Sequence, residues 1–225
     1  MAVDPTPIAH AVAVREMTEV DLRFASALHR SSLGHGLFPA LGPRFLRCYL
    51  RTFTASPTAV ALVAEMDGAA AGFLVGVLDE PRHYRGVVRQ HGLRLAAMGL
   101  IALAVRPRVA WRFARTRMRR YVGWLGRVAR ADRSVGVRVS ASRSADAVLS
   151  HVAVAAEARS ARVGSALVVR FTELARGRGA AATWLVTRSG EAGAGPFYEQ
   201  LGWRRSGEFV DRDGLTWLRY RLDLQ

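Results

Sequence analysis

The sequence predicts an α/β protein in which a mixed β-sheet is flanked by helices. Residues 148–155 form a short apolar run typical of a buried strand, an amphipathic helix starts near Arg162, and a second strand follows at 180–187. A strand, a helix and a strand in this order imply two parallel strands joined by a crossover helix. Strand pairs around short turns predict antiparallel hairpins within 58–78 and 204–222. Parallel and antiparallel pairs together predict the mixed sheet.

The first third of the chain predicts a strand, two helices and a hairpin. Thr18 suits the N-cap of the first helix, because its hydroxyl can accept a hydrogen bond from an amide of the first turn. Pro43 suits the first turn of the second helix, where a missing N–H costs nothing. The expected elements are a strand at 11–15, a helix from Thr18 to about Arg30, a loop at 33–42, a helix from Pro43, and a hairpin whose strands 58–66 and 69–78 meet at Asp67-Gly68.

The positive charge of the chain is concentrated in one block, residues 81–145. The net charge is +15; the block holds 16 arginines and one acid, and the rest of the chain holds 17 arginines and 17 acids. Residues 83–105 are rich in apolar side chains, and Pro107 separates them from a second helical pattern that runs to about Arg130. We therefore expect a basic helical insertion within a single domain of residues 1–225.

Three interpretations of this insertion stay open. The first is a helical hairpin that buries its apolar face against the core or a second subunit, which is compatible with a homodimer. The second is a cover over the active site that receives an anionic carrier, peptide or substrate. Interleaved basic and aromatic residues, such as Arg112 beside Trp111, also suit nucleic acid or an anionic membrane surface. No recognition motif accompanies them, so we do not expect nucleic acid as the partner.

The composition argues against a secreted or membrane-spanning protein. Cys48 is the single cysteine, so no internal disulfide can form, which favours a reducing, cytoplasmic setting. The first ten residues lack the charged and apolar regions of a secretory signal. The longest apolar run, Leu95–Val105, is shorter than the ~18–20 residues that a membrane span needs.

The turn between strand 148–155 and the following helix is the best candidate for a binding site. The start of a helix leaves backbone N–H groups unpaired and presents a partial positive charge. Arg159 and Arg162 add charge there, and Gly164 removes a side chain. Such an end can hold a phosphate, although many solvated turns contain the same residue types.

The segment VAVAAEARSARVGSAL resembles the acetyl-coenzyme A loop of the GNAT superfamily of N-acetyltransferases, whose pattern is Q/R-x-x-G-x-G/A. Arg159 matches the first position and Gly164 the last, while Arg162 stands where the family has its middle glycine. The resemblance covers 146–225 well and 11–78 loosely, and it does not reach the basic insertion.

A second stretch, AGAGPFYEQLGW, resembles another signature of the family, N-x-x-A-x-x-F-Y-x-x-x-G-F. The matched residues are Ala194, Phe197, Tyr198 and Gly202, with Trp203 as a conservative replacement and Glu191 in place of the asparagine. Two signatures in the family's order make the match fairly specific.

The resemblance implies a fold, an activity and a co-substrate. The fold is a mixed central sheet flanked by helices, here with a helical insertion between the third and fourth strands. The activity is transfer of an acyl group from acetyl-CoA, or another acyl-CoA, to a primary amine of a small molecule or peptide; no metal is implied. For a longer acyl chain, the apolar helix around Leu95–Val105 would form a wall. The backbone of Val152, Ala153 and Val154 would pair with the pantetheine arm, and the pyrophosphate would lie on the amides of Arg159, Ser160, Ala161, Arg162, Val163, Gly164 and Ser165.

The resemblance also suggests roles for side chains around the thioester. Tyr198 matches the tyrosine that protonates the coenzyme sulfur, the alternative being a half-buried helical aromatic. Phe197 belongs to the same signature, and Glu191 could orient the coenzyme arm in place of asparagine. In the loop that commonly lines the acceptor site, His35 either contacts the acceptor or packs a glycine-rich turn.

The sequence does not identify one residue as the general base. Strand alternation places Val148, Ser150 and Val152 on the acceptor side, and none of them is a strong base. His151 is expected to point to the other face unless a bulge turns it. Catalysis by His151, a water relay to an acid elsewhere, and an amine that arrives neutral all stay open. So does a different class of function, a catalytically weak binding module whose arginine-rich insertion binds a polyanion, a membrane surface or a partner protein.

Overall fold

The computed structural model describes residues 11–34, 37–108, 110–111, 146–190, 193–211 and 214–224. One seven-stranded sheet runs through the described residues in the order β1-β2-β3-β4-β5-β7-β6. β4 and β5 pair parallel and every other neighbouring pair is antiparallel, which confirms the mixed sheet. The strands are β1 Val12–Glu16, β2 Ala59–Met66, β3 Ala69–Val77, β4 Ala147–Val154, β5 Ala182–Arg188, β6 Arg204–Val210 and β7 Thr216–Asp223.

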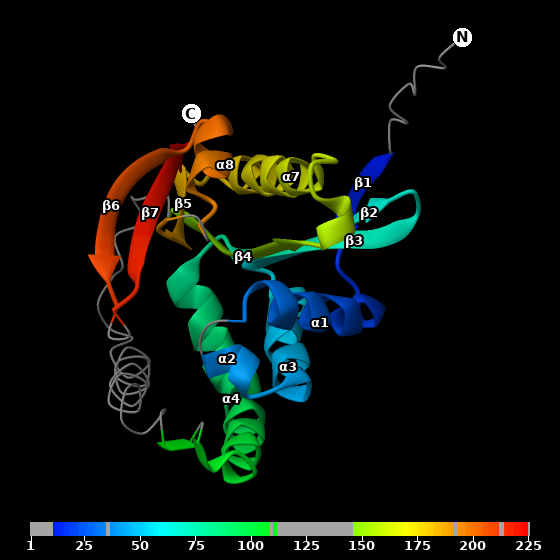
Figure 1. The fold of residues 1–225 in the computed structure, drawn as a ribbon, viewed down its shortest axis with the longest axis vertical. Coiled ribbons are helices and arrows are strands. Elements are labelled where there is room, and N and C mark those ends of the chain that lie inside the picture. The colour runs from blue at the N-terminus through cyan, green and yellow to red at the C-terminus, as the bar shows by residue number, and fades with distance from the viewer. Residues whose placement is uncertain are drawn as a thin grey trace.

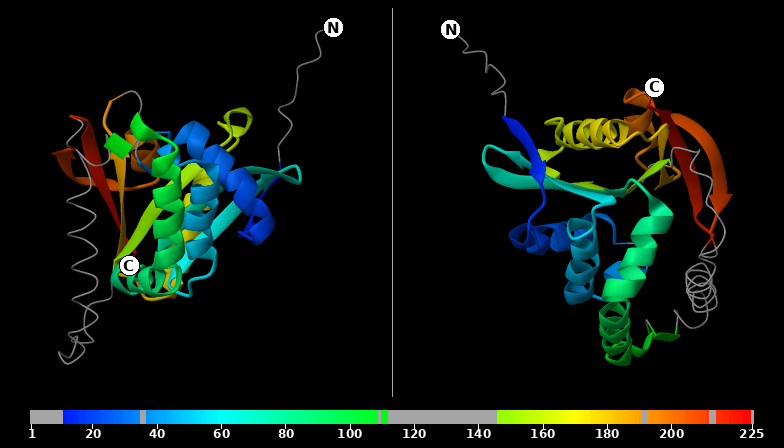
Figure 2. Two further views of the ribbon diagram at one scale, coloured as in Figure 1. Left: turned by 90° about the horizontal axis from the view of Figure 1, so that it is seen from below. Right: turned by 180° about the vertical axis from the view of Figure 1, so that it is seen from behind.

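Helices cover both faces of the sheet (Figure 1). α7, which buries Leu167 and Phe171, lies on one face, and α1, α3 and α4 lie on the other. The view from behind in Figure 2 shows the same two layers. The helices are α1 Leu22–Ser32, α2 Leu37–Ala40, α3 Pro43–Thr54, α4 Glu80–Ala104, α7 Val163–Gly177 and α8 Gly195–Gln200, with short 3₁₀ turns at Glu19–Asp21 and Ala156–Ala158.

The N-terminal elements follow the prediction with two differences. Thr18 precedes the first helix as expected, but a 3₁₀ turn comes before α1, and the Asp21 carboxylate accepts hydrogen bonds from the Thr18 amide and hydroxyl, both at 2.8 Å. The stretch 33–42, expected to be a loop, contains the single-turn helix α2. The Phe38 ring of α2 packs against the Tyr49 ring of α3, with the ring centroids 4.6 Å apart. Tertiary packing therefore stabilises a helical turn in a stretch whose glycines predict a loop.

α4 lies between β3 and β4, where the sequence predicts the start of the insertion. Asp79 caps it by accepting a hydrogen bond from the Arg82 amide at 3.0 Å. Leu95, Met98 and Leu103 pack against the core on the α3 side of the sheet. The predicted second helix, to about Arg130, falls almost entirely outside the described residues, so the insertion as a whole stays a prediction. None of the helices among the described residues is both long and apolar enough to span a membrane.

A bulge in β4 changes which side chains share a face. His151 pairs with Val75 of β3, and Leu149 pairs with the next residue along β3, so Ser150 is the extra residue. Val148 packs with the α1 and α3 side of the sheet, whereas Val152 packs with the α7 side. The expectation that strict alternation puts residues 148, 150 and 152 on one face is therefore wrong.

Candidate active site

A cavity opens where β4 and β5 separate. The two parallel strands pair only at Ala147 with Thr183 and at Val148 with Trp184. Beyond that point, residues 149–154 of β4 and 185–188 of β5 line a cavity of about 1030 Å³. Backbone groups of β4 that would face a neighbouring strand face this space instead, and an extended ligand can pair with them.

The start of α7 forms one end of the cavity and presents unpaired amides. Arg162 is the N-cap residue, and no side chain caps the helix. Within the described structure, the amides of residues 160–165 have no hydrogen-bond acceptor. The amide of Arg159, by contrast, donates to the Ala156 carbonyl at 3.3 Å. The unpaired amides therefore begin at Ser160, one residue later than the predicted phosphate-binding amides.

Arg162 adopts a backbone conformation that favours glycine. Its φ is 60° and its ψ is 12°, in the left-handed region. A residue with a Cβ atom is strained there by about 1–2 kcal/mol. This conformation explains why the similar family pattern has a glycine at the position. The loop thus keeps a glycine-like path with an arginine in it, and the arginine adds a positive charge beside the free amides.

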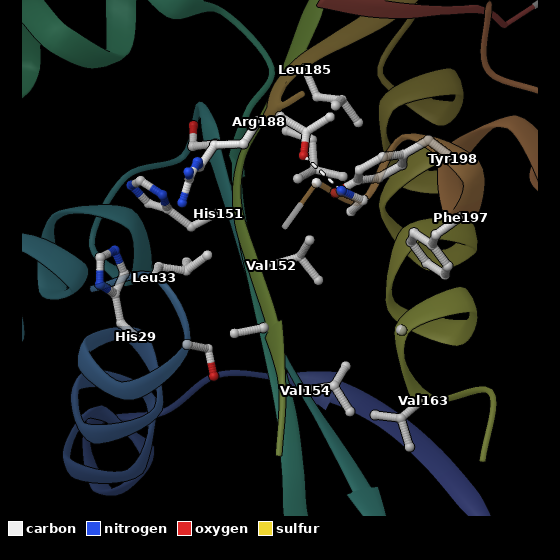
Figure 3. Close-up of a pocket in the computed structure, with 18 of the residues that line it drawn as sticks. His29, Leu33, His151, Val152, Val154, Val163, Leu185, Arg188, Phe197 and Tyr198 are labelled. Carbon is white, nitrogen blue, oxygen red and sulfur yellow. Dashed lines mark hydrogen bonds between the residues drawn. The ribbon is translucent and has the colours of Figure 1, made fainter. Parts of the chain in front are cut away.

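Gly164 lets the start of α7 approach its neighbours. A Cβ atom added at this residue would lie 3.3 Å from the Phe197 ring and 3.5 Å from a Val154 methyl group. Figure 3 shows Val154, Val163 and Phe197 together beside α7. The two segments that resemble family signatures therefore meet in space, at the end of the cavity that holds the free amides.

Tyr198 lies in α8 with its side chain in the protein interior. It is 4% exposed and lines the cavity, with its ring 5.1 Å from that of Phe197 and 5.7 Å from that of Trp203. Burial raises the pKa of the Tyr198 phenol, so the group keeps its proton at neutral pH. A protonated hydroxyl in this setting is available to donate a hydrogen bond to a ligand in the cavity.

The last strand anchors α8. The Tyr220 hydroxyl of β7 donates a hydrogen bond of 2.6 Å to the Glu199 carboxylate, next to Tyr198. Gly195 makes room for this contact, because a Cβ atom there would lie 2.7 Å from the Tyr220 oxygen. The Ala194 amide donates to the Thr187 hydroxyl at 3.1 Å, which ties the start of α8 to β5. These contacts fix the position of Tyr198.

His151 points across the sheet toward α1 and α3, where two aromatic side chains meet it. Its Nε2 lies 3.2 Å from the Tyr49 hydroxyl, and its ring packs edge-on against the His29 ring with centroids 4.8 Å apart. Burial, together with His29, lowers the pKa of His151 to about 3, and burial lowers the pKa of His29 to about 4. Both imidazoles are therefore neutral at pH 7. Figure 3 shows β4 passing between these histidines and the Tyr198 side of the cavity.

Two lining residues, His29 and Arg188, and Tyr49, which contacts the lining residue His151, were not predicted as site residues from the sequence. His29 occupies the apolar stripe of α1, and Tyr49 the apolar face of α3, so helical spacing alone assigns both to the core. Both ring nitrogens of His29 are buried without a hydrogen-bond partner among the described residues. An unsatisfied buried imidazole is unusual for a core residue and distinguishes His29 from its neighbours. Arg188, at the end of β5, carried no sequence signal.

Most of the predicted site residues come together around the cavity. His35 and Glu191 lie outside the described residues, so their roles stay predictions. None of the described residues of α4 lines the cavity, so the expected wall for a longer acyl chain is not observed there. The predicted residues that line the cavity are Ser150, His151, Val152, Ala153, Val154, Arg159, Ser160, Arg162, Val163, Gly164, Ser165, Phe197 and Tyr198, and the predicted residue Ala161 lies in the same turn.

Comparison with known proteins gives a family and a fold. Residues 115–224, just under half of the chain, match the family model described as acetyltransferase (GNAT) domain. No curated protein matches the chain.

Solved structures match over nearly the whole chain. An N-acetyltransferase from Staphylococcus aureus Mu50 is 14% identical, with a TM-score of 0.56 over 96% of this chain and 99% of that one. The ribosomal-protein-S18-alanine N-acetyltransferase from Escherichia coli is 14% identical, with a TM-score of 0.52 over 96% and 95%. An aminoglycoside 6'-N-acetyltransferase complexed with coenzyme A is 12% identical, with a TM-score of 0.55 over 95% and 97%. At these identities the structures show a shared fold, and the family match identifies a GNAT-type acetyltransferase domain over residues 115–224.

Proposed function

We propose that this acetyltransferase transfers the acetyl group of acetyl-CoA to a primary amine of a small molecule or peptide. One observation carries the proposal. The gap between β4 and β5 ends at unpaired amides of residues 160–165, and the buried, protonated Tyr198 lines the same gap. A phosphate-binding end and a proton donor along one slot are what a long thioester substrate requires.

The residues present suit acetyl-CoA. The amides from Ser160 to Ser165 would bind the diphosphate, with the side chains of Arg159 and Arg162 adding charge. The free backbone edge of Val152–Val154 would pair with the amides of the pantetheine arm, as another strand would. One of its N–H groups would then stabilise the negative charge that develops on the thioester oxygen during attack.

Tyr198 would act as the general acid. When the C–S bond breaks, the leaving sulfur needs a proton, and the Tyr198 hydroxyl would supply it. The raised pKa of this phenol keeps the donor protonated at every pH at which the enzyme would work. The apolar surroundings would also exclude water that competes for the acetyl group.

His151 would receive the proton of the amine or orient the amine. Its neutral imidazole has a lone pair available at pH 7, because its pKa lies near 3. With that pKa it is a weak base, so it suits an amine that binds already neutral and loses its proton as the new N–C bond forms. The Tyr49 hydroxyl, 3.2 Å from Nε2, would hold the ring in place.

A thiol-release assay tests the proposal. The purified chain with acetyl-CoA and a panel of amino acids, polyamines, aminoglycosides and peptides should release CoA with at least one acceptor. Product mass should rise by one acetyl group on that acceptor. If acetyl-CoA binds but no amine in the panel accelerates CoA release above hydrolysis, amine acetylation is not the activity.

A further inference from the structure

Among the described residues that line the cavity, the charged side chains all have one sign. Arg159, Arg162 and Arg188 line it, and the described lining residues include neither aspartate nor glutamate. The two lining histidines are neutral at pH 7 for the reasons given above. A described lining with three guanidinium groups and no carboxylate attracts anions and repels cations.

Two of these arginines have an evident role, and the third does not. Arg159 and Arg162 flank the free amides at the start of α7, where the diphosphate of acetyl-CoA would bind. Arg188 is on a different element, at the end of β5. Arg188 is half-buried, and its guanidinium makes no hydrogen bond or ion pair with the residues that the structure describes. A guanidinium that is partly desolvated and unpaired is costly unless a ligand completes it.

The surroundings of Arg188 belong to the acceptor half of the cavity. In Figure 3 its side chain lies on the same side of β4 as His29 and His151, and Tyr198 and Phe197 lie on the other side. Trp217 of β7 pairs with Arg188 in register and lines the cavity too. This half therefore combines one free positive charge, neutral imidazole groups and apolar surface.

We propose that the acceptor is a small amine that also carries a carboxylate, and that Arg188 binds this carboxylate while the amine lies near His151. The inference rests on the proposed function, because it names the substrate class of that site. Arginine presents its donors in a planar fork that matches a carboxylate, which favours a two-hydrogen-bond contact. A polycationic acceptor would find no acidic partner among the described lining residues.

The same charge balance favours an α-amino group over a lysine-like amine. A lysine side chain has a pKa of about 10.4, and the α-amino group of an amino acid, even beside its own carboxylate, has a lower one. Near pH 7.5 the neutral fraction is therefore larger for the α-amino group than for the lysine side chain. Because three guanidinium groups disfavour an ammonium ion nearby, the cavity selects the amine that loses its proton more easily. An α-amino acid has both the required carboxylate and the required amine.

Calorimetric titration of amino acids and their amides into the CoA-saturated protein tests this proposal. Phenylalanine and phenylalaninamide, and leucine and leucinamide, are matched pairs that differ in the carboxylate. In at least one pair we expect the acid to bind about tenfold more tightly than the amide, the size of one charge-assisted contact. Arg188→Gln should reduce that preference below about twofold, and Arg188→Lys should restore part of it.

Two controls separate the acceptor contact from other effects. Arg204→Gln removes an exposed arginine of β6 that does not line the cavity, and it should leave the preference unchanged. Both arginine-to-glutamine variants should bind CoA as the wild type does, which shows that they are folded. A loss of CoA affinity in Arg188→Gln without loss of the acid preference would assign Arg188 to the coenzyme and overturn the proposal.

Three further results would contradict the proposed carboxylate contact. The first is equal or tighter binding of the amides in every pair, and the second is no binding of any amino acid to the CoA-loaded protein. The third is a preference for phosphoethanolamine over all amino acids. Each would contradict the proposal that the acceptor carries a carboxylate. These results would leave the proposed function standing. A wild-type chain that fails to bind CoA would instead remove the proposed function, and the acceptor proposal with it.

Discussion

At the scale of single residues, Tyr198 has the most specific expected role. The sequence signature identified it, and the structure buries it beside the cavity with contacts that hold its helix in place. Three other residues of the site were not predictable from the sequence: His29, Tyr49 and Arg188. The first two look like core residues in a helical pattern, and the third stands alone at the end of a strand, so neither spacing nor composition distinguishes them.

Tyr198→Phe should lower kcat by about 100-fold, because it removes the proton donor for the leaving sulfur. The KM for acetyl-CoA should change less than about threefold, since the ring and its packing remain. Steady-state thiol-release kinetics measure both constants. Tyr84→Phe, which changes a tyrosine of α4 outside the cavity, is the matched control. A Tyr198→Phe enzyme with wild-type kcat would exclude the phenol as the acid.

Arg162→Gly should separate backbone strain from charge. Glycine at φ 60° relieves a strain of about 1–2 kcal/mol, against an entropic cost of about 0.5–1 kcal/mol, so the free energy of unfolding should rise slightly. Acetyl-CoA affinity should fall severalfold, because one positive charge leaves the phosphate site.

Arg162→Val is the companion variant for this test. It removes the same charge but places a β-branched residue in the left-handed region, so its free energy of unfolding should fall. Denaturant unfolding and titration calorimetry measure the two effects. If the glycine variant were less stable than the valine variant, the assigned backbone conformation of this turn would be wrong.

At the scale of elements, the bulge in β4 and the separation of β4 from β5 create the site. The order of strands and helices was predictable, because hydrophobic periodicity, caps and turn residues are local signals. The bulge itself was not predictable, because no residue type near Ser150 marks it; the sequence shows only that a bulge would change the direction of His151. The early separation of β4 from β5 depends on pairing between segments far apart in the chain, and local sequence patterns do not reveal it.

Gly76→Ala tests the close packing of α7 against this part of the sheet. A Cβ atom at Gly76 would lie 2.4 Å from the Phe171 ring and 2.8 Å from the Val148 carbonyl oxygen. Relieving this clash needs a shift of α7 or β3, so the free energy of unfolding should fall by about 1–3 kcal/mol.

The same substitution at Gly92 is the control. In α4 the nearest atom to an added Cβ is 3.8 Å away, and alanine favours a helix interior over glycine by about 1 kcal/mol. Gly92→Ala should therefore raise the free energy of unfolding. Urea denaturation compares the pair, and equal effects at the two positions would contradict the packing described for Gly76.

At the scale of the whole molecule, buried histidines should make stability depend on pH. Burial lowers the pKa of His29 and of His83 to about 4, and burial with His29 lowers that of His151 to about 3. An unfolded histidine has a pKa of about 6.5, so between about pH 4 and 6.5 the unfolded chain binds more protons than the folded one. Stability is therefore lost as pH falls through this window, by up to about 1.4 kcal/mol per pH unit for each histidine.

Guanidinium denaturation at pH 7, 6 and 5 measures this dependence. The free energy of unfolding should fall steadily toward pH 5, and His83→Gln should reduce the slope, because glutamine does not titrate. The ion pair of Arg15 with Asp21 lowers the pKa of the carboxyl, so its stabilisation is fully present above about pH 4 and is lost only below that pH, outside this window. A free energy of unfolding that is constant from pH 7 to 5 would mean that these imidazoles are not buried in neutral form.

The central claim is that the start of α7 binds the diphosphate of acetyl-CoA, and thermal unfolding with two ligands tests it most directly. A ligand at 100 times its Kd stabilises a folded protein by about 2.7 kcal/mol, which corresponds to a Tm increase of roughly 5–10 °C for a chain of this size. Acetyl-CoA should produce this increase, and pantetheine, which lacks the diphosphate, should produce almost none at the same concentration. An unchanged Tm at saturating acetyl-CoA, or an equal shift with pantetheine, would contradict the claim.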